Sequence, residues 1–149
     1  MKSILIVDDE KNIRLTLSEC IQSMDYDIEM AENGEEALQK IKAKDFNLVL
    51  LDLRLPGMDG MEVLKRAKEA YPGVQVVMLT GHGSEKDEAE ARRLGVFEYL
   101  RKPIPIESLM KVLKAAYEKK LQDAMVAATF AEAGEFGTAR EIMDKSKKR

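Results

Sequence analysis

The sequence contains one cysteine, one histidine and no tryptophan among its 149 residues. A single cysteine, Cys20, cannot form an intrachain disulfide, which is typical of proteins that fold in a reducing cytoplasm. A single histidine, His82, excludes a metal centre that needs several imidazole ligands. No run approaches the roughly 20 apolar residues of a membrane span, and two aspartates interrupt the short N-terminal apolar run, unlike a signal peptide. The sequence therefore predicts a cytoplasmic protein without a membrane segment.

The chain also lacks an excess of positive charge. Its 24 lysines and arginines are outnumbered by 27 aspartates and glutamates, which gives a formal net charge of −3. This balance gives no electrostatic reason to expect direct binding of nucleic acid. With 45% hydrophobic and 34% charged residues, the composition is ordinary for a globular chain, and the length suits one domain with a real core.

Five short apolar runs alternate along the chain with five segments of helical periodicity. The runs cover residues 3–7, 28–31, 46–51, 74–79 and 96–100, and helices are expected to begin near residues 10, 34, 60, 85 and 106. An unbroken leucine and valine run at residues 48–51 is typical of a strand buried on both faces. Repeated β-α units with short connections predict an α/β fold, a doubly wound parallel sheet of five strands with helices on both faces.

The last predicted helix continues past the end of the fifth β-α unit. Its apolar stripe runs from Ile106 to about residue 128, so at about 1.5 Å per residue it should project beyond a small domain. Glycines within residues 134–137 interrupt the pattern, and a short amphipathic segment follows. We therefore expect a domain at residues 1–118 and a helical extension at residues 119–149 that ends in a short hairpin. A homodimer through the last helices is the alternative way to cover the stripe.

Polar residues follow four of the five predicted strands: Asp8 and Asp9 the first, Asp52 the third, Thr80 the fourth and Lys102 the fifth. Because the carboxyl ends of parallel strands meet at the edge where open α/β sheets bind ligands, these side chains should lie together. Three crowded carboxylates without histidine or thiolate ligands favour Mg²⁺. The hydroxyl and the ammonium suit a phosphoryl group carried by Asp52. Singly, these residues are also typical of helix caps and turns, and only the set indicates a site.

Four motifs together resemble the receiver domain of two-component response regulators, the CheY-like family. They are ILIVDDE at residues 4–10, LVLLDLRLPGMDG at 48–60, MLTGHGS at 78–84 and YLRKPI at 99–104. Each motif alone has low specificity, whereas the four in this order and spacing are highly specific. The resemblance covers about residues 1–118 and implies the strand order 2-1-3-4-5.

By this resemblance, Asp52 is the phosphoryl acceptor. Asp9 would bind Mg²⁺ directly and Asp8 mainly through water, while Asp52 and the backbone carbonyl of Arg54 would complete the protein ligands. Arg54 and His82 occupy positions that, in the family, influence how fast water removes the phosphoryl group. Because both side chains are bulky, we predict that they slow autodephosphorylation.

The resemblance also implies how the site would signal. Thr80 would hydrogen-bond the phosphoryl group, and Lys102 would form an ion pair with it. Tyr99 stands at the position of the switch aromatic, which turns inward when Thr80 moves toward the phosphate. The peptide bond between Lys102 and Pro103 is expected to be cis.

These assignments predict a phosphorylation-dependent signalling switch. A sensor histidine kinase would donate the phosphoryl group, and a downstream protein target would read the result, because about 30 further residues are too few for an ordinary DNA-binding domain. A phosphate relay intermediate and a phosphorylation-independent interaction module are the alternatives. A phosphatase of the haloacid-dehalogenase type also uses an aspartate nucleophile with Mg²⁺, but it carries a general acid two residues further on, where this chain has Arg54. We therefore expect no enzyme activity beyond self-phosphorylation and autodephosphorylation.

Overall fold

The computed structural model describes residues 2–132 of the chain. Strands and helices alternate in the order β1 (Ser3–Val7), α1 (Lys11–Gln22), β2 (Asp27–Ala31), α2 (Gly34–Ala43), β3 (Leu48–Leu51), α3 (Gly60–Ala70), β4 (Gln75–Thr80), α4 (Glu85–Arg93), β5 (Glu98–Arg101) and α5 (Ile106–Glu132). All neighbouring strands pair in parallel, in the order β2-β1-β3-β4-β5. The predicted doubly wound sheet and its strand order are both confirmed.

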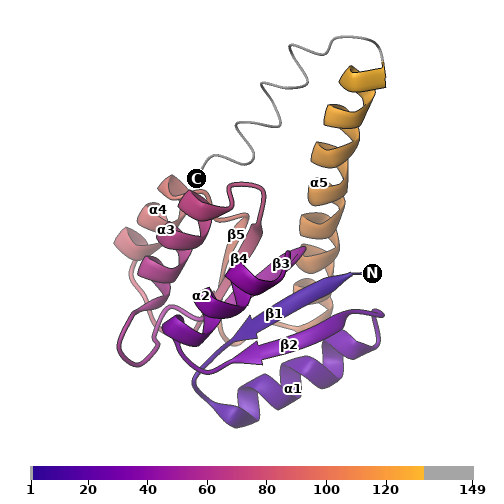
Figure 1. Cartoon of the computed structure of the whole chain (residues 1–149). Coiled ribbons are helices and arrows are strands. Elements are labelled where there is room, and N and C mark those ends of the chain that lie inside the picture. The colour runs from indigo at the N-terminus through magenta and orange to yellow at the C-terminus, as the bar shows by residue number, and fades with distance from the viewer. Residues whose placement is uncertain (1, 133–149) are drawn as a thin grey trace.

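A layer of helices covers each face of the sheet (Figure 1). Helices α1 and α5 pack on one face, and α2, α3 and α4 pack on the other. Because successive strand residues point to opposite faces, Leu5 and Val7 join the core under α2–α4, whereas Ile4 and Ile6 join the core under α1 and α5. This two-sided burial explains the unbroken apolar sequences of β1 and β3.

Side-chain caps fix where three of the helices begin. Asn33 accepts a hydrogen bond from the Glu36 amide at the start of α2. Asp59 and Ser84 cap α3 and α4, and Ser84 forms a reciprocal capping box with Asp87. Such caps satisfy amides that the first turn of a helix leaves without a partner. They also fix where the loops between strands and helices end, at the edge where the polar residues gather.

Three strands, β3, β4 and β5, begin one or two residues later than the sequence predicts, and turn hydrogen bonds explain the shifts of β5 and β4. The Val96 amide donates to the Ala91 carbonyl, so this residue closes the turn after α4 instead of opening β5. The Val74 amide likewise donates to the Tyr71 carbonyl, and β4 begins at the next residue. In both places a turn hydrogen bond takes the amide that strand pairing would have used.

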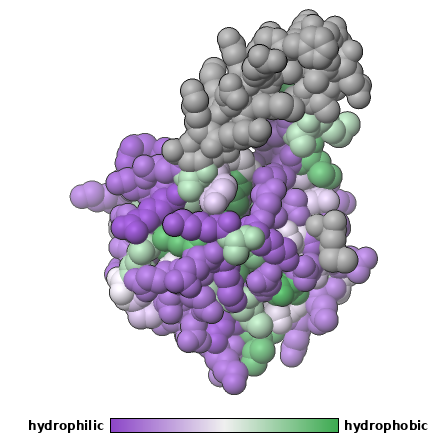
Figure 2. All heavy atoms as spheres, viewed as in Figure 1, coloured by the Kyte–Doolittle hydropathy of each residue, from purple (hydrophilic) through white to green (hydrophobic). Residues whose placement is uncertain are grey.

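Helix α5 runs without a break from the domain into the predicted extension. Lys120 ties it back by donating to the Gly73 carbonyl at 3.1 Å, whereas Leu121, Met125 and Val126 are exposed. Figure 2 shows hydrophobic side chains near the upper end of the described part of α5, on a face where hydrophilic side chains predominate. The predicted hairpin lies outside the described residues, and the division at residue 118 stays a prediction. Within residues 2–132, no helix combines the length and apolar character that a membrane crossing requires.

Candidate functional site

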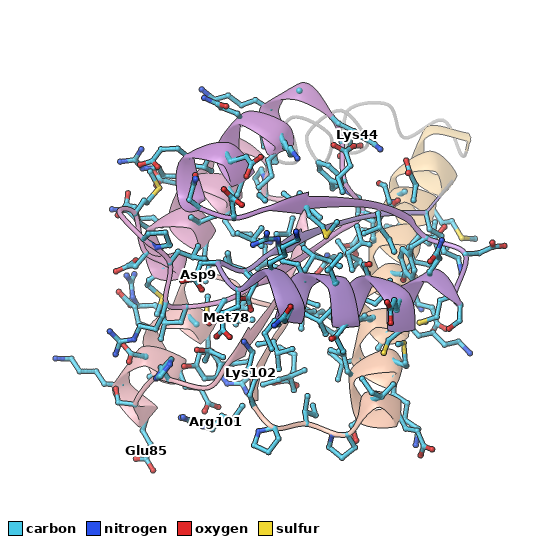
Figure 3. All side chains as sticks on the ribbon, turned by 90° about the horizontal axis from the view of Figure 1, so that it is seen from below. Asp9, Lys44, Met78, Glu85, Arg101 and Lys102 are labelled. Carbon is cyan, nitrogen blue, oxygen red and sulfur yellow. The ribbon has the colours of Figure 1, made fainter. Side chains whose placement is uncertain are left out.

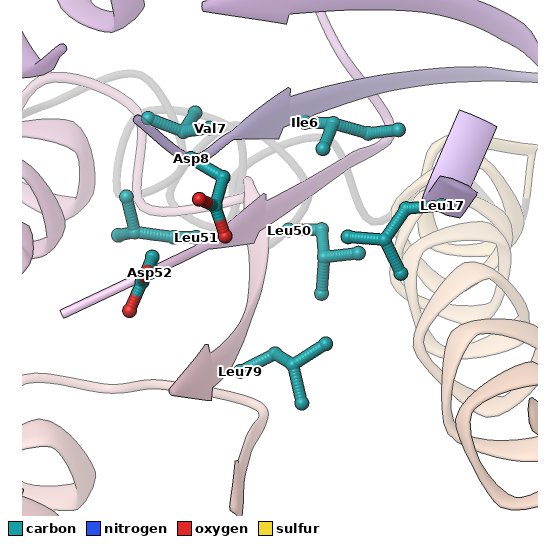
Figure 4. Close-up of a pocket in the computed structure, with 8 residues that line it drawn as sticks. All are labelled: Ile6, Val7, Asp8, Leu17, Leu50, Leu51, Asp52 and Leu79. Carbon is teal, nitrogen blue, oxygen red and sulfur yellow. The ribbon is translucent and has the colours of Figure 1, made fainter. Parts of the chain in front are cut away.

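The polar residues predicted to meet do meet at the carboxyl edge of the sheet. Val7 pairs with Leu51, so Asp8 and Asp52 leave the neighbouring strands β1 and β3 side by side. The boundary between β1 and β3 is also the topological switch point of the sheet, because the strand order reverses direction there. Ligand sites in such folds usually lie at this point. Figure 4 shows the two carboxylates beside a pocket whose remaining lining residues are apolar: Ile6, Val7, Leu17, Leu50, Leu51 and Leu79.

Both carboxylates are buried, and each is oriented by a nearby backbone amide. Asp8 is 2% exposed and Asp52 is 5% exposed. The Glu10 amide donates to Asp8 Oδ1 at 2.9 Å, and the Arg54 amide donates to Asp52 Oδ1 at 3.3 Å. In each carboxylate, one oxygen is thus held by the local loop and the other is available for a partner across the site.

Lys102 is that partner for both carboxylates. Its Nζ lies 3.0 Å from Asp8 Oδ2 and 3.5 Å from Asp52 Oδ2. Burial disfavours the charged ammonium, but the hydrogen bond to Asp8 and the charges of both carboxylates outweigh this effect, so the pKa of Lys102 is raised. The Lys102–Pro103 peptide bond is cis, as expected. A fixed ammonium between two buried carboxylates suits a phosphoryl group on either of them.

Thr80 and Tyr99 lie next to this centre. Thr80 ends β4 fully buried, and its hydroxyl accepts a hydrogen bond from the His82 amide at 3.1 Å. The Lys102 amide donates to the Thr80 carbonyl at 2.8 Å, which holds these two residues together through their backbones. The Tyr99 ring is turned inward and is 5% exposed.

The donor set fits a hard divalent cation. Asp8, Asp9 and Glu10 each offer a carboxylate oxygen, and these oxygens lie within 4.8 Å of one another. Lys102 pairs with Asp8 of this group and with Asp52, and the oxygen-only donors suit Mg²⁺. Figure 3 shows Asp9 and Lys102 on the same side of the molecule. Asp52 is not part of the three-residue group and is joined to Asp8 through Lys102.

Sequence reasoning missed two residues that support the site. Glu10 joins the acidic group, and its only signal was its place directly after two aspartates. Gly60 approaches the backbone of Asp52 so closely that a Cβ there would overlap the Asp52 carbonyl oxygen. The Gly60 amide also donates to the Leu53 carbonyl at 2.7 Å, which closes the loop after β3 against α3. Only glycine permits this approach.

The fold and the site define a class: α/β proteins with a doubly wound parallel sheet and an acidic pocket at its carboxyl edge. Within that class, residues 4–114 match the family model described as "Response regulator receiver domain". The chain belongs to this family. Receiver domains interact with histidine kinases and with downstream targets.

Individual relatives agree with this assignment. Sporulation initiation phosphotransferase F of Bacillus subtilis (strain 168) is 36% identical over 113 residues, which are 76% of this chain and 91% of that protein. Transcriptional regulatory protein ZraR of Klebsiella oxytoca is also 36% identical, but the match spans only 26% of its length. The crystal structure of a CheY-like receiver domain protein from Methanospirillum hungatei JF-1 superposes with a TM-score of 0.80 at 32% identity, covering 83% of this chain and 98% of that one.

Proposed function

We propose that the protein is a phosphorylation-dependent switch in which Asp52 accepts a phosphoryl group from a sensor histidine kinase. One observation carries the proposal: a buried carboxylate at the end of β3 faces a fixed ammonium, beside a group of acidic residues suited to Mg²⁺. A solvated surface aspartate would have neither partner. The proposal places the protein in the cytoplasm, with its kinase.

The transfer follows from the positions of these side chains. An oxygen of Asp52 forms a bond to phosphorus while the phosphorus–nitrogen bond of the kinase's phosphohistidine breaks, and the nitrogen keeps the electron pair. Lys102 moves from pairing two carboxylates to pairing the phosphoryl oxygens, and the Thr80 hydroxyl donates to another of them. Asp8, Asp9, Asp52 and the carbonyl of Arg54 would hold Mg²⁺. When bound, this ion neutralises charge that develops on the transferred oxygens.

The output is proposed to be a protein contact. Movement of Thr80 toward the phosphoryl group changes the loop between β4 and α4, and Tyr99 on β5 responds to it. The affected surface is formed by α4, β5 and the start of α5, and a downstream protein binds one state better than the other. Direct binding of nucleic acid has no part in this proposal.

A relay intermediate is the second candidate function. The relative from Bacillus subtilis is named a phosphotransferase, and this chain covers nine tenths of its length. In a relay, Asp52 would pass the phosphoryl group on to another histidine instead of keeping it. Turnover of phosphate esters is not part of either proposal, because Arg54 stands where such phosphatases carry a general acid.

The exposed apolar residues of α5 suggest a homodimer as an additional partner. Leu121 and Met125 lie one helical turn apart on the same face. If a second copy covers them, replacing both with alanine lowers the mass measured by light scattering. An unchanged mass excludes this dimer and leaves the switch proposal intact.

Intact-protein mass spectrometry after treatment with acetyl phosphate tests the proposed function. The expected result is one phosphoryl adduct that requires Mg²⁺ and is absent in Asp52→Ala. Asp45→Ala is the matched control, because its side chain is 90% exposed and lies beside Ser3 at the amino edge of the sheet, and this variant should carry the adduct. An adduct on Asp52→Ala, or none on the natural chain, would overturn the proposal.

A further inference from the structure

The Tyr99 hydroxyl lacks a hydrogen-bond partner. Among the residues that the structure describes, this oxygen is the one buried side-chain nitrogen or oxygen atom that has no hydrogen-bond partner. Burying a hydroxyl without a partner is unfavourable, because the hydrogen bonds it makes with water are lost and not replaced. The inward ring must therefore be held by other contacts.

Gly83 forms the floor of the slot that receives the hydroxyl. A Cβ built on Gly83 would overlap the Tyr99 oxygen, and it would lie 3.0 Å from Cδ2 of Leu53. The backbone of Gly83 has φ +123°, in the region that favours glycine. Glycine at this position thus leaves room for the ring to turn inward.

Arg101 closes the slot from the solvent side. It lies two residues after Tyr99 on β5, so both side chains project from the same face of the sheet. Its guanidinium lies over the Tyr99 ring, with Cζ 5.5 Å from the ring centroid. Its Nη1 donates to the Gly83 carbonyl at 2.8 Å, and its Nη2 reaches Glu88 on α4 at 3.4 Å. One side chain therefore joins the ring, the loop after Thr80 and the helix of the proposed output surface.

We propose that Arg101 is a positioning residue that latches Tyr99 in its inward orientation. The ring cannot turn outward without displacing the guanidinium from the Gly83 carbonyl, and the loop cannot move without disturbing the same bond. Resting on the proposed function, this latch couples movement of the loop after Thr80 to the orientation of Tyr99 and to Glu88 on α4. Arg101 has no part in binding Mg²⁺ or the phosphoryl group.

Fluorine NMR of protein labelled with 3-fluorotyrosine tests the latch. The chain has four tyrosines, and the Tyr99→Phe variant assigns the Tyr99 resonance by its loss. The measured quantity is the line broadening of each resonance by a soluble gadolinium chelate, which reports solvent access. In Arg101→Ala the broadening at Tyr99 should increase on the order of fivefold, the effect of losing one exposed cation–π contact and one hydrogen bond.

Several variants make this result specific. Arg93→Ala removes an exposed arginine that pairs with Glu90 on α4, and it should leave Tyr99 unchanged. Arg101→Lys keeps the positive charge but loses the guanidinium, whose two nitrogens contact two separate acceptors. The broadening of the Tyr99 resonance in Arg101→Lys should therefore lie between its values in Arg101→Ala and in the natural chain. Gly83→Ala fills the slot and supplies the reference signal of an outward ring.

An unchanged Tyr99 signal in Arg101→Ala overturns the latch. If all four resonances become accessible, the variant has lost its fold, and Arg101→Met decides instead, because it keeps an apolar side chain of similar length but has neither a donor for the Gly83 carbonyl nor a charge over the ring. Increased access at Tyr99 alone in that variant supports the latch, and no increase overturns it. The experiment uses no phosphoryl donor, so its outcome is independent of whether Asp52 is phosphorylated.

Discussion

Replacing Lys102 with methionine removes the ammonium that lies between Asp8 and Asp52 while keeping a side chain of similar length. The two carboxylates are nearly inaccessible to water, so the solvent cannot replace the lost charge. At the 3.0 Å that separates Nζ from Asp8 Oδ2, Coulomb attraction is about 5 kcal/mol at an effective dielectric constant near 20. The cost of desolvating the ammonium, which is 24% exposed, offsets part of this. We expect a net loss of about 1–3 kcal/mol in the free energy of unfolding.

Magnesium should compensate for this loss. Without the ammonium, the site is more negative by one charge, so Mg²⁺ should bind on the order of tenfold more tightly. At saturating Mg²⁺, this tighter binding restores about 1.4 kcal/mol of the free energy of unfolding. The defect of Lys102→Met is therefore largest in the presence of a chelator and smaller in Mg²⁺.

Urea unfolding, followed by circular dichroism with and without Mg²⁺, measures both effects. Lys111→Met is the matched control, because it removes an equal charge from an exposed position on α5, and it should change neither the stability nor its dependence on metal. Equal unfolding midpoints for Lys102→Met and the control, in chelator and in Mg²⁺ alike, would refute the electrostatic account of the site.

Three further predictions concern other parts of the molecule. Gly60→Ala should lower the free energy of unfolding by about 1–3 kcal/mol in a urea titration, because its Cβ would overlap the Asp52 carbonyl; wild-type stability would contradict the close approach. The double variant Arg54→Ala, His82→Ala should lose its phosphoryl group several-fold faster in a mass-spectrometric decay series, and an unchanged lifetime would exclude the proposed slowing. Burial raises the pKa of Tyr26 from 10.0 to about 12, so between these values the unfolded state ionises first. The free energy of unfolding should fall on the order of 2 kcal/mol over that pH range, and by less in Tyr26→Phe. The same dependence of unfolding free energy on pH in both proteins would contradict this.

The fold was predictable because its local and long-range patterns agree. The run at residues 48–51 is apolar at every position, and the structure buries all of it. Asp59 and Ser84 stand where helix caps are needed, and both caps form. Alternating strands and helices with short connections leave few topologies. Strand starts were less certain because turn hydrogen bonds, such as that from Val96 to Ala91, compete with strand pairing.

The sequence was enough to predict which residues gather at the site, but not which of their side chains pair with one another. Position after a parallel strand is enough to bring Asp8, Asp52 and Lys102 to one edge. That Lys102 lies closer to Asp8 than to Asp52 depends on side-chain geometry, which sequence spacing does not encode. The contact of Arg101 with Gly83 was equally hidden, because an exposed arginine on a charged surface has many potential acceptors.

Locating the modified residue tests the central claim most directly. After treatment with acetyl phosphate and Mg²⁺, borohydride reduces an aspartyl phosphate to homoserine, and peptide mass spectrometry then identifies the converted position. We predict homoserine at Asp52 and unconverted aspartate at Asp8 and Asp9. Conversion at either of those two residues, or at none, would contradict the assignment of Asp52 as the phosphoryl acceptor.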